Sequence, residues 1–181
     1  MKRLSNTVKA LLAKARESAL LAVETYNRPT ATFRSGAYIV LMVIAWTSLF
    51  HAIFFRRNSK PYYRKPGSRR YQKLDGDYRW WELGECLQQY YKDDNSSVRK
   101  NLEFFIALRN KIEHRSLPQL DNEIFGECQA MLMNFERCFA LNSVTDMQYG
   151  EVFLSHSSFH ARLPSSRIHQ LTGKNDEHSA Q

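Results

Sequence analysis

The chain has 181 residues, 43% of them hydrophobic and 13% aromatic, which suits one domain with a packed core and argues against a disordered chain. Its formal net charge of +8 points toward a polyanionic partner or surface. Its three cysteines, Cys86, Cys128 and Cys138, show no C-x-x-C spacing, so neither a disulfide framework nor a zinc site is indicated, and a reducing cytoplasm fits.

The first predicted helix covers residues 8–26. Its apolar residues, among them Leu12, Ala15, Ala19 and Val23, recur at intervals of three and four, the period of a helix with one buried face. Pro29 predicts its end, because the residue before a proline avoids the helical region.

Residues 37–55 (AYIVLMVIAWTSLFHAIFF) form a nineteen-residue apolar stretch that is open to two interpretations. It is long and apolar enough to span a bilayer, and it is also typical of the central helix of a bundle. Thr47, Ser48 and His51 interrupt its second half, so we expect a bundle helix and a protein that does not insert into a membrane. We expect His51 to be a hydrogen-bonded core or interface histidine, because no second metal-ligating residue has ligand spacing to it.

Residues 56–79 form a strongly basic loop, with nine Lys or Arg residues opposed by Asp75 and Asp77. Its prolines and glycines rule out a long helix. Basic side chains interleaved with tyrosines could hold phosphates and stack bases, and a solvated loop without a ligand is the alternative. The candidate RNA contacts here are Arg64, Lys65, Arg69 and Arg70.

Further helices are predicted at residues 78–91, from residue 97 onward, and at residues 124–140, where the apolar period returns. Five helices with short connections predict an all-α, up-and-down helical bundle over residues 1–142. Residues 143–164 alternate loosely between apolar and polar, which indicates a strand or hairpin. Residues 165–181 are polar without a period, and we expect a disordered tail.

The segment 101–115 (NLEFFIALRNKIEHR) carries the candidate chemistry, because a helical apolar run leads into Arg109, Asn110 and His114. The planar arginine cation fits phosphate oxygens, and histidine titrates near neutral pH. Together they suffice to cleave RNA without a metal: the histidine takes the proton of the ribose 2′-hydroxyl, and the arginine stabilises the charge that develops on the phosphate.

The spacing of these two residues imposes a condition. Residues five apart on a straight helix do not share a face, so Arg109 and His114 converge only if the helix bends, if the arginine wraps around it, or if a second chain contributes. The alternative is structural: Arg109 and Glu113 share a face and could form an ordinary surface ion pair.

Arg109-Asn110-x-x-x-His114 resembles the Arg-x(4–6)-His motif of the HEPN superfamily of helical domains. The surrounding text, LEFFIALRNKIEHR, EIFGECQAMLMNFE and the earlier SALLAVETYNRPTATFRSGAYIVLMVIAWTSLFHAIF, resembles one bacterial branch, the domain of unknown function family 3644. The similarity covers about residues 15–141, and it implies a HEPN-like bundle.

The resemblance further implies a cytoplasmic homodimer with a composite site. In that site His114 is the general acid or base, Arg109 stabilises charge and Asn110 orients one of them. The auxiliary residues are Glu113 and Lys111, and Arg34 and Arg115 join the candidate RNA contacts. The expected activity is a metal-independent endoribonuclease that leaves 2′,3′-cyclic phosphate ends, without a cofactor, in phage defence or toxin-antitoxin growth arrest with an antitoxin or regulatory partner. The alternative is a non-catalytic module that binds nucleotide, RNA or protein.

Overall fold

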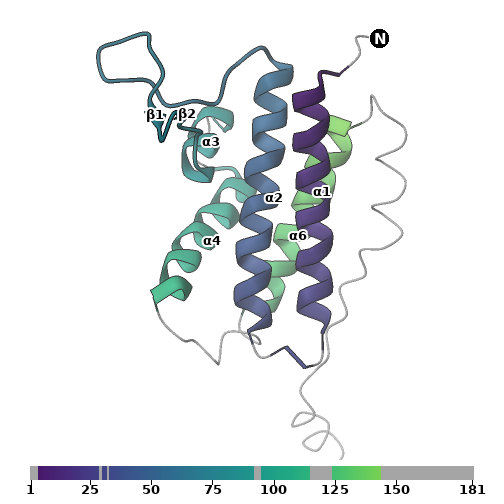
Figure 1. The fold of residues 1–181 in the computed structure, drawn as a ribbon. Coiled ribbons are helices and arrows are strands. Elements are labelled where there is room, and N and C mark those ends of the chain that lie inside the picture. Colours follow the sequence, from purple (N-terminus) through teal and green to yellow (C-terminus); the bar gives the residue numbers. More distant parts are fainter. Residues whose placement is uncertain (1–3, 29, 32, 92–94, 115–123, 144–181) are drawn as a thin grey trace, which may run out of the picture.

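The computed structural model describes residues 4–28, 30–31, 33–91, 95–114 and 124–143, which form five α-helices and one two-stranded sheet (Figure 1). The predicted all-α, up-and-down bundle is confirmed. Apart from residue 143, the predicted C-terminal strand or hairpin and the predicted tail lie outside the described residues. The elements are α1 (Asn6–Asn27), α2 (Arg34–Arg56), β1 (Lys73–Leu74), β2 (Asp77–Tyr78), α3 (Leu83–Tyr90), α4 (Ser97–His114) and α6 (Phe125–Ser143).

Helix α2 is the centre of the bundle, with α1, α3, α4 and α6 packed around it (Figure 1). Helix α1 runs antiparallel to α2 and turns fully buried alanines toward the core, including Ala15, Ala19 and Ala22. Small side chains let the two backbones approach closely, which explains why α1 and α2 form the most extensive helix pair. On another side of α2, the buried Trp46 ring meets the edge of Phe135 from α6, with ring centroids 5.5 Å apart.

Helix α2 meets the length and composition of a membrane span, with a mean hydropathy of 2.0 over its most apolar window, yet 72% of that window is buried inside the bundle. Its Tyr38 hydroxyl donates a 2.8 Å hydrogen bond to the backbone carbonyl of Cys128 on α6. A helix that is apolar all round and enclosed by four others is what the bundle interpretation predicts.

The prediction of a helix at residues 78–91 is wrong for residues 78–82, because α3 begins only at Leu83. Residues 61–81 instead form a twisted antiparallel ribbon, which we call the basic ribbon. The Tyr63 amide donates to the Arg79 carbonyl at 2.9 Å, and the Gln72 amide donates to the Tyr63 carbonyl at 2.8 Å. Between β1 and β2, Asp75 and Gly76 both have positive φ (50° and 92°), as a two-residue hairpin turn requires.

Aromatic packing explains why this segment prefers the extended form. Tyr78 and Trp80 are two residues apart, so they share one face of a strand but would point in different directions on a helix. Both pack against Tyr62, with ring centroids 4.9 Å and 5.0 Å away, and Tyr71 completes the cluster at 5.4 Å. Cross-strand aromatic pairs of this kind stabilise a short sheet.

Candidate functional site

Helix α4 carries the Arg-His motif and is anchored along one side. Its start is capped by the Ser96 hydroxyl, which accepts from the Arg99 amide at 3.4 Å. The Asn101 side chain donates to the Glu127 carboxylate on α6 at 2.9 Å. The buried stripe, at helical intervals toward the bundle, consists of Leu102, Phe105, Leu108 and Ile112. This anchoring determines which face of α4 the motif residues occupy.

The motif residues lie on the faces of α4 next to the buried stripe, and they differ in exposure. Arg109 is half-buried, whereas Asn110 and Lys111 are exposed. Helix α4 is continuous through His114, its last residue. The side chains of Glu113 and His114, and Arg115 as a whole, lie outside what the structure describes.

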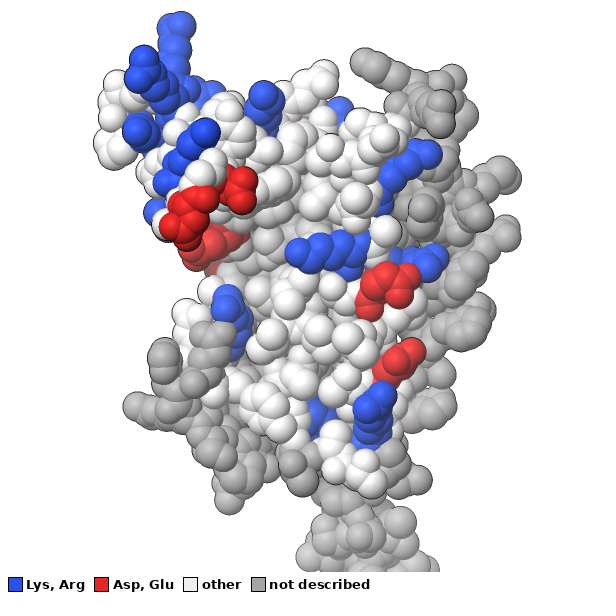
Figure 2. All heavy atoms as spheres, in the orientation of Figure 1, with Lys and Arg blue, Asp and Glu red and all other residues white. Residues whose placement is uncertain are grey.

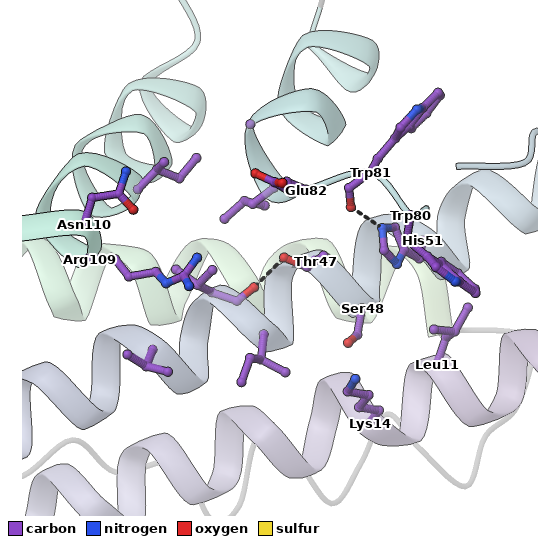
Figure 3. A pocket seen from close by; sticks show the side chains of 16 residues that line it. Leu11, Lys14, Thr47, Ser48, His51, Trp80, Trp81, Glu82, Arg109 and Asn110 are labelled. Atoms are coloured by element: carbon purple, nitrogen blue, oxygen red, sulfur yellow. Dashed lines mark hydrogen bonds between the residues drawn. The ribbon is translucent and has the colours of Figure 1, made fainter. Parts of the chain in front are cut away.

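Arg109 and Asn110 line a cavity of about 560 Å³ (Figure 3). The other walls come from α1, from α2, and from the chain that leads from the end of the basic ribbon into the start of α3. Lys14 on α1 and Arg109 on α4 approach the cavity from different helices (Figure 3). The aliphatic lining comes mainly from α2, with one residue each from α1, α3 and α4: Val40, Val43, Ile44, Leu11, Leu83 and Ile106.

His51 forms part of the cavity wall, and one of its two ring nitrogens is already hydrogen-bonded within the protein. Its side chain is 6% exposed, and its Nε2 donates to the Trp81 carbonyl at 2.9 Å, since a carbonyl only accepts. The Trp80 ring lies 4.9 Å from the imidazole. Burial lowers the pKa of His51 below 6.5, the hydrogen bond to Trp81 opposes this shift, and the positive charge of Lys14 adds to it. The expectation of a hydrogen-bonded core or interface histidine is confirmed, and the lowered pKa favours the neutral imidazole.

The described residues of the cavity wall carry more positive than negative side-chain charge. Glu82 is the one carboxylate among them, and its Oε1 lies 3.8 Å from Arg79 of the basic ribbon. Glu82 is also the residue before α3, and its side chain makes no capping hydrogen bond to that helix. Among the residues that the structure describes, no three His, Cys, Asp or Glu side chains lie close enough together to hold a metal ion.

The predicted RNA contacts on the loop gather on the basic ribbon, which projects from one end of the bundle (Figures 1 and 2). Arg64, Lys65, Arg69 and Arg70 are all exposed there. Arg34 is not brought to this group: it begins α2, at the opposite end of that helix from the ribbon, where it lies over the Tyr26 ring at 5.7 Å.

The cavity residues that sequence analysis did not assign to a site include Lys14, His51 and Trp80. His51 was predicted only as a hydrogen-bonded core or interface histidine. Lys14 has no local signal, because a lysine off the apolar stripe of α1 resembles any solvated residue. Trp80 was placed on a helix, although the Asp75-Gly76 hairpin signal could have placed it on a ribbon.

Comparison with known proteins adds one match. A family model described as "Domain of unknown function (DUF3644)" matches residues 10–179. No curated protein and no solved structure shows significant similarity to the chain.

Proposed function

The chain belongs to the DUF3644 family, and from its motif helix we propose that it is a metal-independent endoribonuclease of the HEPN type. The observation that carries this proposal is that Arg109 and Asn110, next to each other in the motif, line a cavity that also holds Lys14. A phosphate in that cavity would meet two cations. Arginine presents a planar fork that matches phosphate oxygens, and lysine adds a point charge.

In the proposed reaction, His114 of one chain takes the proton of the ribose 2′-hydroxyl as that oxygen attacks the adjacent phosphorus. The bond from phosphorus to the 5′-oxygen breaks, and the second His114 of a homodimer returns a proton to the leaving oxygen. The products are a 2′,3′-cyclic phosphate and a 5′-hydroxyl. Arg109 stabilises the extra negative charge on the phosphate in the transition state, and Asn110 orients one of the catalytic groups.

The course of α4 supports a composite site rather than one within a single chain. The helix is continuous from Ser97 to His114. Five residues of an α-helix correspond to a rotation of about 140° beyond one full turn. Arg109 and His114 are therefore on different sides of α4, and a second copy is the simplest source of a histidine opposite Arg109. The proposed setting remains growth arrest in phage defence or a toxin-antitoxin pair, with a regulatory partner.

The test is cleavage of a labelled RNA in EDTA by Arg109→Ala and His114→Ala, with Arg137→Ala as the matched control. Arg137 is an exposed arginine on α6 and does not line the cavity. We expect each motif variant to lose at least a hundredfold in rate, since one misplaced or missing group costs about that much. The control should keep the parental rate. If both motif variants cleave like the parent, the assignment fails.

A second candidate is a non-catalytic HEPN-type module that binds nucleotide, RNA or a protein. The observation that favours it is the cavity itself, because about 560 Å³ lies within the range of small-molecule sites and needs no catalysis to be useful. RNA that is retained on the protein but stays intact in EDTA would favour this module over the nuclease.

A further inference from the structure

The cavity beside Arg109 is larger and more varied than a phosphate alone requires. Side chains of Val43, Ile44 and Ile106 give it an apolar wall, and Ser48 and His51 interrupt that wall with polar groups. A planar, partly polar ring suits such a wall better than a bare anion does. The volume of about 560 Å³ can hold a ring together with an attached sugar and phosphate.

The cavity wall also carries two cations that could bind a phosphate. Lys14 and Arg109 enter from two different helices (Figure 3). Glu82, the carboxylate of the wall, has Arg79 at 3.8 Å as a counter-charge. Among the lining residues that the structure describes, two side chains are positive and one is negative, and this balance complements one phosphodiester.

A row of aromatic side chains extends from the cavity wall onto the basic ribbon. Trp80 lines the cavity, is 37% exposed, and packs at 5.0 Å against Tyr62 of the basic ribbon. Tyr78, 47% exposed, stacks on Tyr62 at 4.9 Å, and Lys73 lies 5.4 Å from the centre of its ring. Exposed rings next to cations are the combination that single-stranded nucleic acid uses, since bases stack on the rings and phosphates contact the cations.

We propose that the cavity is the binding site for one unpaired nucleotide of single-stranded RNA, with its base against Trp80 and the apolar wall and its phosphate between Lys14 and Arg109. This inference deepens the proposed function and rests on it, because it identifies the substrate as unpaired RNA. A base in a duplex cannot enter, since pairing and stacking hold it inside the helix. The neighbouring nucleotides of the strand continue along the basic ribbon.

The experiment measures binding of a fluorescent 2′-O-methyl RNA, which has no 2′-hydroxyl and cannot be cleaved by the proposed route. Trp80→Leu keeps an apolar side chain without a stacking face, and Trp80→Phe restores a ring. Lys14→Gln removes one exposed cation of the cavity, and Arg137→Gln removes one elsewhere. Circular dichroism and thermal melting establish that each variant is folded.

We expect Trp80→Leu to weaken binding about tenfold, and Trp80→Phe to stay within about threefold of the parent. Lys14→Gln should lower the slope of log affinity against log salt by about 0.7, whereas Arg137→Gln should leave it unchanged. A duplex of the same sequence and free mononucleotides should compete poorly. The proposal is overturned if Trp80→Leu and Lys14→Gln both bind like the parent, if the duplex binds equally well, or if a mononucleotide binds as tightly as the strand.

These outcomes are separable from those of the nuclease test, because binding is read without cleavage. Loss of binding in Trp80→Leu together with undiminished cleavage in the Arg109 and His114 variants would keep the nucleotide site and reject the catalytic assignment. Loss of cleavage in the Arg109 and His114 variants, together with unchanged binding in Trp80→Leu and Lys14→Gln, would keep the catalytic assignment and reject the nucleotide site.

Discussion

The basic ribbon offers a sharp test of RNA contact, because its cations can be removed without disturbing its backbone. Lys65, Arg69 and Arg70 are exposed at its outer end. The hydrogen bonds that Lys65 and Arg70 make within the ribbon use their main-chain atoms: the Lys65 amide donates to the Arg70 carbonyl at 2.9 Å, and the Arg70 amide donates to the Ser68 hydroxyl at 3.1 Å. The triple variant Lys65→Gln, Arg69→Gln, Arg70→Gln should therefore fold like the parent.

The expected magnitude follows from counterion release. Each phosphate contact on a single strand contributes about 0.7 to the slope of log affinity against log salt, so three contacts contribute about 2.1. Between about 50 and 200 mM salt, the parent should lose roughly twentyfold more affinity than the triple variant. The assay is fluorescence anisotropy of a 2′-O-methyl RNA across this salt range.

The matched control removes three cations elsewhere, by Arg28→Gln, Lys100→Gln and Arg137→Gln. All three are exposed, and none belongs to the ribbon or lines the cavity. Both variants have the same net charge, so general attraction falls equally in both. If the two slopes agree, the ribbon charges act only through net charge, and the ribbon does not contact RNA.

Three further predictions concern single side chains. The pKa of His51 is lowered in the fold, mainly by burial, so the unfolded chain binds more protons between that pKa and 6.5. The contribution of His51 to stability is present above pH 6.5 and is lost as the pH falls through this window. Urea unfolding at several pH values should therefore show that the unfolding free energy of the parent falls more steeply in this window than that of His51→Asn. Burial raises the pKa of Cys86 to about 12 and of Cys138 to about 11, so both thiols should resist alkylation at pH 8 until the protein is unfolded, as mass spectrometry would show. Tyr38→Phe removes the buried hydrogen bond to the Cys128 carbonyl, which should cost about 1 kcal/mol in urea unfolding.

The helices of the bundle could be predicted because their signals are local. Helix α1 was expected at residues 8–26 and runs Asn6–Asn27, and α4 was expected from residue 97 and begins at Ser97. In both, an apolar stripe at helical intervals coincides with end signals next to it in sequence. For α4 the cap is Ser96, whose hydroxyl accepts from the Arg99 amide.

The basic ribbon was missed because its stabilising contacts are not local. Its aromatic residues at 78, 80 and 81 also fit a helical stripe, and only partners far along the chain decide between the two. Trp80 pairs with Tyr62, eighteen positions earlier, and the Trp81 carbonyl accepts from His51 on α2. The Asp75-Gly76 turn, with positive φ at both residues, is the local signal for a hairpin in this segment.

The candidate site likewise contains residues that a local motif predicts and residues that only the packing of distant helices brings in. Arg109 and Asn110 were selected from a short motif on one helix, and the structure places both at the cavity. Lys14 comes from a helix almost a hundred residues earlier, and it lines the same cavity as Arg109 only because α1 and α4 both pack on α2. Which cations share a cavity depends on the packing of three helices, and no local pattern encodes that.

The orientation of α4 separates binding from catalysis in the proposed enzyme. Lys14, Trp80 and Arg109 line a cavity formed within one chain, whereas in the proposed composite site the histidine opposite Arg109 comes from a second copy. A monomer should then bind RNA without cleaving it. On dilution through the dimer dissociation constant, determined by analytical ultracentrifugation, cleavage per chain should fall with the dimer fraction while the affinity for a 2′-O-methyl RNA stays constant. A monomer that cleaves at the full rate would show that Arg109 and His114 of one chain meet on their own, and the composite site would have to be abandoned.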